Sequence, residues 1–294
     1  MPQIELRPFL QALGGPLGRA PLDVQERLEP EDPATLLEDD IVEVTAAPPP
    51  PASTVFLDGI QSATTLTYRN HRPLTLAMAG AGAVTGRLEP VMVEETLDLL
   101  AARADIAWAE EQGCPTAIRC ISESDAPTDV EREVGNCLGQ ERDALEVLLT
   151  QRLALDDQWD LICVDGGLAG RPGDHRIVGI VKTTNTRLLN DESVLWRLPE
   201  GYRSPAFQLP PHYGGSDAAP RMSAYVRMRD ASDAAWQTGL VRVEAYSKEA
   251  LDLAAATALA YRQPTATTDP RGDRHISPIA HVETWMRSRR PTYL

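Results

Sequence analysis

Two short apolar runs, each ending in Asp-Gly, are the features that most limit the folds open to this chain. The first is TVFLDG, which ends at Asp58 and Gly59, and the second is DLICVDG, which ends at Asp165 and Gly166. A continuous apolar run of about four to eight residues that stops at a turn residue is typical of a strand buried on both faces of a sheet. We therefore expect a sheet covered by helices, in which two of the strands end in carboxylates.

The remaining patterns complete one α/β domain. Period-2 alternation and short apolar runs predict further strands, with a turn at Asn70–Pro73, for residues 64–70, 73–80, 116–122, 175–184, 222–228 and 239–246. Apolar residues at helical spacing predict helices over residues 93–111, 139–155, 247–262 and 277–290. No internal repeat follows residue 54, so we assign residues 54–294 to a single domain.

Residues 1–53 differ from this domain and are expected to form an N-terminal arm. They hold ten acidic and three basic side chains, a net charge of −7, with a few leucines and valines at weakly helical spacing. The segment closes with Pro48–Pro51, and a proline run forms a stiff, extended linker. An acidic arm of this kind is expected to pack on a partner or on its own domain.

Charge and composition exclude several classes of protein. A net charge of −15 argues against a protein that coats nucleic acid non-specifically. Of 28 basic residues only Lys182 and Lys248 are lysines, and the arginines clustered after residue 262 suit bidentate phosphate contacts. No apolar run approaches the ~20 residues of a spanning helix, and the first residues lack a signal pattern, so we expect a soluble, cytoplasmic protein without membrane contact. The four cysteines form no CxxC pair and are expected to be buried free thiols.

Several common catalytic motifs are absent from the sequence. There is no GxxxxGK[ST] phosphate loop, no HExxH, no GxSxG and no kinase signature. The segment GAGAVTG at residues 80–86 faintly resembles a dinucleotide fingerprint, but its glycine spacing is too long and Pro90 follows where a helix should open. We interpret it as a loop or bulge.

The two strand-end aspartates are the strongest candidates for chemistry. A buried strand fixes the direction of the carboxylate at its end, and the glycine that follows Asp58 or Asp165 lets backbone or ligand approach closely. Two such groups side by side repel each other unless a cation lies between them. Mg²⁺ and Mn²⁺ are the usual cations, because hard ions prefer carboxylate oxygens. The alternative is that each Asp-Gly simply begins a turn.

A third carboxylate would complete such a metal site, and the helix over residues 139–155 offers two. Glu146 lies on the same side as the apolar positions Leu149 and Leu153, which favours it over Glu141. The alternative for Glu146 is an ordinary surface salt bridge with Arg142, four residues earlier.

The C-terminal helix adds His281 as a further candidate. Ile279, Val282 and Met286 form the apolar face of this helix, so His281 lies away from its centre. It is either a structural or surface residue, or it binds the metal or positions a water molecule. Several nearby arginines could hold phosphates: Arg271, Arg274, Arg287, Arg289 and Arg290.

Taken in order, the motifs resemble those of the NurA nucleases. The similar segments, spread over residues 54–290, are FLDGIQ, VDGGL, IVGIVKTTNTRLL, SAYVRM with GLVRVEAY, and SPIAHVETWMRSR. The resemblance implies an RNase H-like core, with a central mixed β-sheet flanked by helices, and a homodimer. It also implies DNA cleavage with Mn²⁺ or Mg²⁺, alongside a hexameric HerA-type DNA-translocating ATPase, in DNA end processing or phage defence.

The resemblance also assigns roles to individual residues. Asp58 and Asp165 match the two metal-binding aspartates, and His281, in the Pro-x-x-His frame, matches a C-terminal active-site histidine. Lys182 and Tyr225 match an active-site lysine and tyrosine. The first motif departs from the family pattern, because it has Asp-Gly-Ile where Asp-Gly-Ser is commoner.

The residues and the resemblance suggest the same mechanism. Two ions held by Asp58, Asp165 and a glutamate would bind the scissile phosphate and activate water, while Lys182 or an arginine offsets charge on the transition state. One alternative is a catalytically weak adaptor of the same fold that docks to the ATPase and regulates it. Another is a metal phosphohydrolase acting on small molecules, which would need a closed pocket in place of a groove.

Overall fold

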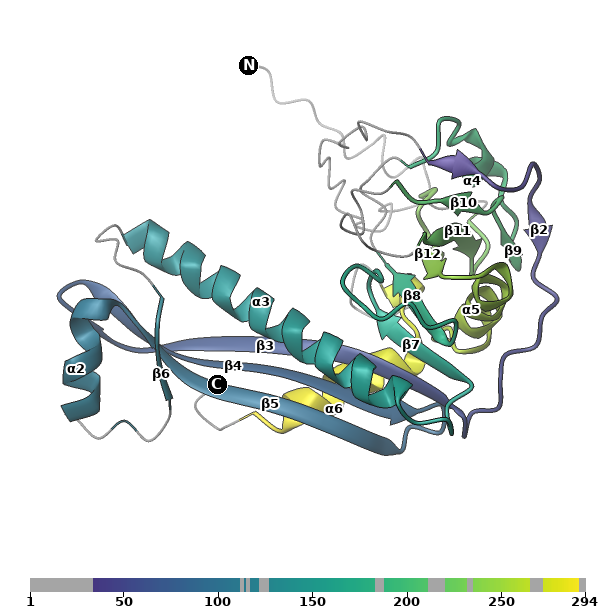
Figure 1. The fold of residues 1–294 in the computed structure, drawn as a ribbon. Coiled ribbons are helices and arrows are strands. Elements are labelled where there is room, and N and C mark those ends of the chain that lie inside the picture. The colour runs from purple at the N-terminus through teal and green to yellow at the C-terminus, as the bar shows by residue number, and fades with distance from the viewer. Residues whose placement is uncertain are drawn as a thin grey trace, which may run out of the picture.

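Three long antiparallel strands build one end of the molecule (Figure 1). They are β3 (Thr54–Arg69), β4 (Arg72–Thr85) and β5 (Pro90–Ala101). The turn joining β3 to β4 has positive φ at Asn70 and His71, as a two-residue type I′ hairpin requires.

In the computed structural model the described residues are 34–111, 114, 117–121, 127–182, 188–210, 220–231, 235–264 and 272–290.

The sheet continues from β3 into the other end of the molecule. β7 (Leu161–Asp165) runs parallel to the start of β3, β8 (Ile177–Val181) runs parallel to β7, and β12 (Leu240–Ala245) and β11 (Met222–Arg227) follow in antiparallel order. Short strands extend the edges: β6 (Ala117–Cys120), β1 (Thr35–Leu36), β2 (Val42–Glu43), β9 (Tyr202–Arg203) and β10 (Phe207–Gln208). The resulting order is β1-β10-β11-β12-β8-β7-β3-β4-β5-β6, a single mixed sheet.

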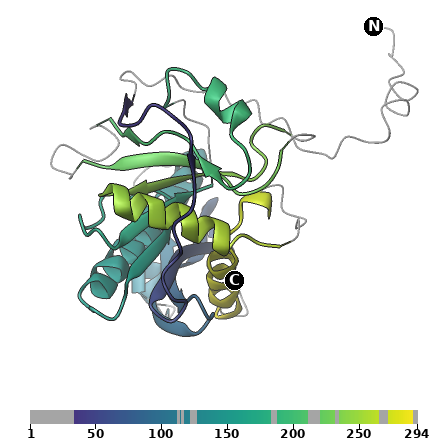
Figure 2. The same ribbon diagram turned by 90° about the vertical axis from the view of Figure 1, so that its right-hand side faces the viewer.

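Helices cover both faces of this sheet, as Figure 2 shows from the end of the molecule. α3 (Pro127–Ala154) packs Leu145, Leu149 and Leu153 on one face, while α5 (Lys248–Ala260) and α6 (Ser277–Ser288) cover the other. The remaining helices are α2 (Arg103–Glu111), α4 (Ser193–Arg197) and the 3₁₀ turn η2 (Gly272–Arg274). The predicted α/β fold with a helix-flanked mixed sheet is confirmed. Among the described residues, no helix is both long and apolar enough to cross a bilayer.

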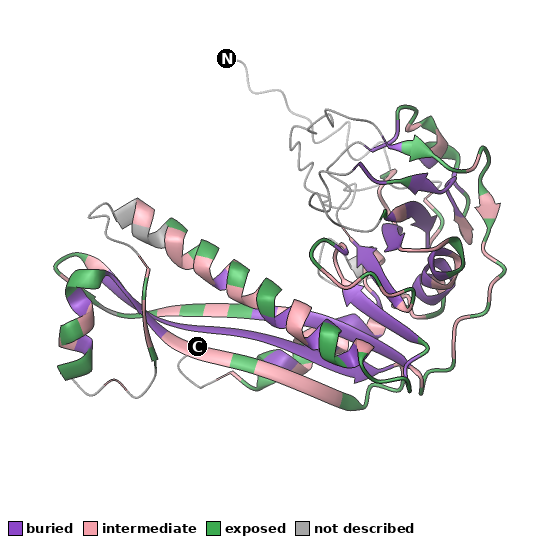
Figure 3. Cartoon of the chain, in the orientation of Figure 1, coloured by how far each residue is buried: buried purple, intermediate pink, exposed green. Residues whose placement is uncertain are grey.

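Of the two alternatives predicted for residues 80–86, the loop is wrong, whereas the bulge agrees with a register shift between Ala83 and Val84 where β4 pairs with β5. Most of this segment belongs to β4, which is buried along nearly its whole length (Figure 3). Its glycines face α6: a Cβ on Gly80 would lie 2.8 Å from Cε of Met286, and one on Gly82 would lie 2.7 Å from its Sδ. The intervening alanines pack in the core on the α3 side. The small residues therefore allow two helices to approach one strand closely, a tertiary requirement that resembles a loop in the sequence.

The helix predicted for residues 93–111 is also partly wrong. Residues 90–101 form β5, and α2 begins only at Arg103. β5 pairs along almost all of β4, and this pairing outweighs the weak helical spacing of VEETLDLL because Val91, Val93 and Thr96 fit a pleated surface. The helix predicted for residues 139–155 is instead longer than predicted, because α3 already begins at Pro127.

The described part of the predicted arm joins the sheet. β1 pairs with β10 and β2 pairs with β9, which ties residues 34–44 across the outer edge. Between these strands, Glu38 forms an ion pair with the buried Arg203, accepts from the backbone N–H of Ala206 at 2.9 Å, and lies 3.0 Å from Nζ of Lys248. We call residues 34–44 the strap. Residues 1–33 lie outside the described residues.

The four cysteines are free, but they are not uniformly buried as predicted. Cys163 lies in the core, Cys114 and Cys137 are half-buried, and Cys120 is exposed. Burial raises the pKa of the Cys163 thiol, so this side chain behaves as a small apolar core residue.

Candidate active site

The site begins where β3 loses one of its two neighbours. β7 pairs with β3 only from Thr54 to Leu57, and beyond that point no described strand pairs with this edge of β3. Leu57 is the register partner of Val164, so Asp58 and Asp165 are the next residues on two neighbouring parallel strands. Neighbouring strands are about 4.8 Å apart, and residues in one row share a face. The structure therefore places the two predicted aspartates side by side. Asp165 ends β7 as predicted, but the prediction that a strand ends at Asp58 is wrong, because antiparallel pairing with β4 extends β3 to Arg69.

Asp58 lies in an unfavourable electrostatic environment. Asp58 is 7% exposed, and its Oδ1 accepts a hydrogen bond of 2.8 Å from the backbone N–H of Gly59. Burial raises the pKa of Asp58 well above its ordinary value, and the negative charge of Asp165 raises it further; the Lys182 ammonium acts in the opposite direction. Because its negative charge is disfavoured here, the Asp58 carboxylate favours binding of a proton or a cation.

Lys182 is placed beside the second aspartate. It follows the last residue of β8, and its Nζ lies 3.0 Å from Oδ2 of Asp165. The Lys182 side chain is 12% exposed and that of Asp165 is 25% exposed, so the pair lies at the edge of the core and faces the cavity. The family resemblance suggested Lys182, and the structure brings it to both aspartates.

Glu146 reaches the same place from α3. Its Oε2 lies 2.6 Å from Nη2 of Arg171, and its Oε1 lies 3.5 Å from Nε of Arg142. Burial raises the pKa of Glu146, and Arg171 opposes that effect. A Cβ on Gly59 would lie 2.3 Å from Oε1 of Glu146, so the glycine of the first Asp-Gly makes room for this carboxylate. By contrast, Glu141 pairs with Arg119 at 2.7 Å and does not line the cavity.

Arg171 was not identified from the sequence. It lies midway along the loop between β7 and β8, where its Nε donates to the carbonyl of Gly167 at 3.3 Å and its Nη1 donates to Oγ1 of Thr150 at 3.2 Å. The one available signal was its position six residues after Asp165, as the first charged residue beyond GGLAG.

A second buried acid, Glu244, contacts the backbone of the loop between β7 and β8. Glu244 accepts from the backbone N–H of Leu168 at 2.8 Å and from Nη1 of Arg221 at 2.9 Å, and it forms an ion pair with Nη1 of Arg242 at 2.7 Å. The hydroxyl of Tyr246 donates to the carbonyl of Arg171 at 3.2 Å. β12 and the residue after it therefore hold the first half of the loop that follows Asp165 and contains Arg171.

These groups line a cavity of about 590 Å³ along the edge of β3 that β7 leaves free. Its lining includes five carboxylates (Asp58, Asp143, Glu146, Asp165, Glu283) and four fixed cations (Arg142, Arg171, Lys182, Arg287). With every group ionised, and His275 neutral, the lining carries one excess negative charge. A polyanion would therefore need cations to bind here.

Two predicted residues do not line this cavity. His281 is half-buried on α6, about 160° around the helix from Glu283, one of the α6 side chains that face the cavity. Tyr225 is 1% exposed and packs in a separate hydrophobic cluster, with its ring centroid 5.8 Å from that of Phe207. The histidine that lines the cavity is His275, just before α6, which the sequence interpretation missed.

The donors at the site suit a hard divalent cation. Asp58 and Asp165 supply adjacent carboxylates whose mutual repulsion a cation would relieve. Glu146 is turned onto Arg171, and within the described residues no three His, Cys, Asp or Glu side chains gather closely enough to hold one metal ion. The two aspartates therefore fit such an ion, whereas Glu146, the predicted third ligand, is paired with Arg171.

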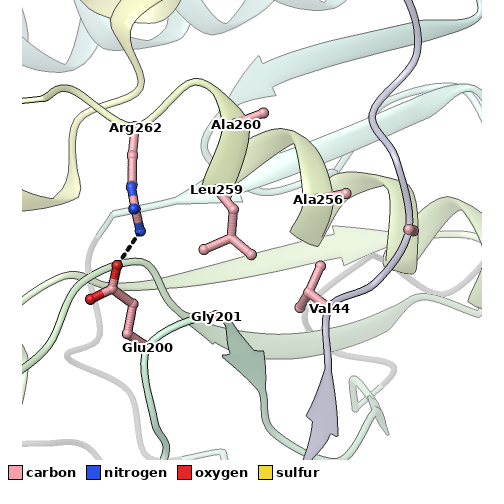
Figure 4. A pocket seen from close by; sticks show the side chains of 8 residues that line it. Val44, Glu200, Gly201, Ala256, Leu259, Ala260 and Arg262 are labelled. Atoms are coloured by element: carbon pink, nitrogen blue, oxygen red, sulfur yellow. Dashed lines mark hydrogen bonds and ion pairs between the residues drawn. The ribbon is translucent and has the colours of Figure 1, made fainter.

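A second cavity of similar size lies between the strap and α5 (Figure 4). Its walls are mostly small and apolar, from Val44, Ala256, Leu259 and Ala260, and its charged groups are Glu200 and Arg262, paired at 2.7 Å. None of the predicted site residues lines it, and it offers no unbalanced charge.

Comparison with known proteins adds no identification. No protein-family model matches the chain, and no curated protein matches it. The inference of function therefore depends on the site and on the motifs.

Proposed function

We propose that this protein is a divalent-metal-dependent deoxyribonuclease that hydrolyses phosphodiester bonds. The observation that carries the proposal is the pair of adjacent carboxylates on neighbouring strands, the buried Asp58 within β3 and the half-buried Asp165 at the end of β7, whose repulsion is opposed by the ammonium of Lys182. Sites built in this way favour Mg²⁺ or Mn²⁺, and the preferred chemistry of such ions with nucleic acids is phosphoryl transfer.

The sheet topology supports the finer fold proposal. Within the large sheet, β5, β4 and β3 are antiparallel, and β3, β7 and β8 are then parallel, with α3 entering the chain before β7. We propose that this five-stranded unit is the RNase H-like core expected from the resemblance to NurA nucleases. It carries one aspartate within its central strand and another at the end of the neighbouring strand.

The chain's own side chains have separate tasks in this proposal. Asp58 and Asp165 would hold the metal, which when bound lowers the pKa of the attacking water and neutralises phosphate charge. Lys182, held at 3.0 Å from Asp165, would offset negative charge that develops on the phosphate. Arg142 on α3 and Arg287 on α6 line the cavity from two helices and would contact the DNA backbone.

The partners proposed from the resemblance are a second copy of the chain and a hexameric HerA-type ATPase, in DNA end processing or phage defence. The acidic balance of the cavity supports delivery by such a translocase, because this cavity alone gives a polyanion little attraction. The uncharged edge of β3 from Gly59 to Tyr68, which pairs with no described strand on the β7 side, supports self-association, since an exposed edge can pair with another strand.

The second candidate is the adaptor of the same fold. The observation that favours it is the ion pair that holds Glu146 on Arg171, away from a three-carboxylate arrangement. An adaptor would keep the fold and the docking surfaces without needing the third carboxylate.

Cleavage of end-labelled linear DNA by purified protein separates the two proposals. It is run with Mn²⁺, with Mg²⁺ and with EDTA, for the wild type, Asp58→Ala, Asp165→Ala and the matched control Glu141→Ala. Glu141 shares α3 with Glu146 but lies outside the cavity lining, so its variant should remain active. We expect metal-dependent cleavage that both aspartate variants lose. No cleavage with either metal, even with a HerA-type ATPase added, would overturn the nuclease proposal and favour the adaptor.

A further inference from the structure

The buried ion pair between Arg171 and Glu146 is the feature of the site that the proposed chemistry does not use. Both side chains are nearly inaccessible, 7% and 8% exposed, and the distance from Nη2 to Oε2 is 2.6 Å. Removing one partner of a buried pair leaves an uncompensated charge, so the remaining group needs a substitute of the same sign as the lost partner. A divalent cation is one such substitute for Arg171 beside Glu146.

Arg171 is held in place independently of Glu146. Its Nε donates to the Gly167 carbonyl, its Nη1 donates to Oγ1 of Thr150, and its own carbonyl accepts from the Tyr246 hydroxyl. All three contacts are with neutral groups and would survive if the Glu146 carboxylate turned away. The guanidinium would then remain at the cavity wall, with its Nη2 released from Glu146.

The Glu146 carboxylate lies close to the aspartate that would hold the proposed ion. Its Oε1 lies over Gly59, in the space that a Cβ at that residue would occupy, and Gly59 directly follows Asp58. The carboxylates of Glu146 and Asp58 line the same cavity. A rotation about the side-chain torsions of Glu146, without movement of α3, would turn its carboxylate from Arg171 towards an ion bound at Asp58.

We propose that Arg171 is the resident cation of this site, competing with the divalent ion for Glu146 and, once released, binding a phosphate of the DNA backbone. This inference rests on the proposed metal-dependent function. It makes Arg171 the residue that couples ion binding to phosphate binding: the guanidinium is neutralised by Glu146 while no ion is bound, and it becomes available when the ion takes the carboxylate. An arginine suits this role because its planar fork matches either a carboxylate or a phosphate.

The direction of one measurement separates this role from a merely structural one. Removing a positive charge beside a cation site strengthens cation binding, whereas loss of a purely structural contact weakens or does not change it. We expect Arg171→Met, which keeps an apolar stem, to bind Mn²⁺ roughly tenfold more tightly than the wild type in a titration without DNA, by calorimetry or electron paramagnetic resonance.

The same variant should lose affinity for DNA once the ion is present. A labelled oligonucleotide is titrated with protein in Ca²⁺, and we expect Arg171→Met to bind at least severalfold more weakly than the wild type. Thr150→Val is the matched control: it removes a neutral anchor of Arg171 and keeps the charge, so its Mn²⁺ affinity should stay within about twofold of the wild type.

A double variant covers the case in which Arg171→Met does not fold. Glu146→Gln with Arg171→Met removes both buried charges, which proteins tolerate better than the loss of one. This double variant should bind Mn²⁺ more tightly than Glu146→Gln alone, because the repelling guanidinium is gone.

The possible failures are distinguishable. If the wild type binds neither Mn²⁺ nor Mg²⁺, the proposed function fails and this inference fails with it. If the wild type binds Mn²⁺, Asp58→Asn abolishes that binding, and Arg171→Met binds no more tightly than the wild type, the metal site stands and Arg171 is structural. Unchanged oligonucleotide binding by Arg171→Met would also overturn the phosphate role.

Discussion

Two acidic clusters contact the first half of the loop between β7 and β8, one centred on Glu244 and one on Asp58, and they differ in how completely their charges are balanced. Glu244 is 2% exposed, accepts from Arg221 and from the backbone N–H of Leu168, and forms an ion pair with Arg242. Asp58 is similarly buried at 7%, yet its nearest charged neighbours include two more carboxylates, and one backbone N–H donates to it.

The comparison shows which of two buried acids indicates function. Glu244 is compensated and lies under a loop, so it stabilises the fold and gains nothing from a ligand. Asp58 is uncompensated and lines a cavity of about 590 Å³, so a cation from solution would lower its free energy. Burial alone did not distinguish them; the balance of charge and the access to solvent did.

Removing the compensated acid should give the largest change in stability. Glu244→Ala leaves two arginines, 4% and 9% exposed, without their buried carboxylate, and we expect the free energy of unfolding to fall by about 3–5 kcal/mol. Urea denaturation measures it, with Glu249→Ala, an exposed acid on α5, as the control. A loss no larger than the control's would mean that the cluster is not the structural half of the comparison.

Removing the charge of Glu38, which pairs with Arg203 and holds the strap, should give an intermediate loss of stability that depends on pH. Arg203 lowers the pKa of Glu38 from an ordinary 4.5 to about 2, so the charged form is stabilised by folding. Its contribution is complete above pH ~4.5 and disappears as the pH falls towards 2. Glu38→Gln should therefore lose about 1–3 kcal/mol at pH 7 and much less at pH 3, whereas Glu43→Gln, exposed on the strap, should lose little at either pH.

Removing the charge of Asp58, the uncompensated acid, should raise the free energy of unfolding rather than lower it. Asp58→Asn deletes a buried charge that neighbouring carboxylates repel, so in EDTA at pH 7 the variant should be more stable than the wild type by about 1–2 kcal/mol. Because the pKa of Asp58 is raised by folding, the wild type regains stability as the pH falls from that raised value towards 4, and the difference should shrink. A destabilised Asp58→Asn protein at pH 7 would place Asp58 with Glu244 as a structural acid.

The smallest expected changes in stability come from alanine substitutions at two glycines, Gly135 and Gly59. Gly135, on the exposed side of α3, has no neighbouring atom within 4 Å of the position that a Cβ would take, so Gly135→Ala should stabilise the protein by up to about 1 kcal/mol. Gly59→Ala should instead destabilise it and displace Glu146, whose Oε1 occupies the position of the new methyl group. Thermal unfolding of both variants tests the pair, and equal shifts would show that Glu146 adjusts freely.

The sequence predicted the centre of this site better than its surroundings. The apolar runs before Asp58 and Asp165 are local signals, and they placed two carboxylates at strand positions that prove to be adjacent. Glu146 followed from the spacing of α3, because a helix presents its polar and apolar positions at fixed angles. The turn at Asn70 and His71 was likewise a local property of the chain.

The misses share a physical cause, which is dependence on partners distant in the sequence. The glycines of β4 make sense only with Met286 packed on them, and β5 is a strand because β4 pairs with it. The role of Arg171 depends on α3 and on Thr150, and nothing in the loop itself indicates that contact. His275 and His281 are six residues apart, but only the fold determines which one lines the cavity.

The parallel pairing of β3 with β7 has a consequence for how the site comes into being during synthesis. The β3–β4–β5 meander consists of neighbours in sequence, and contacts of this kind form early in folding. β7 and Lys182 are made more than a hundred residues after Asp58, and a chain still on the ribosome at that stage has one aspartate without the other. The destructive chemistry proposed for this protein is therefore withheld until most of the domain has been translated and its late strands have docked.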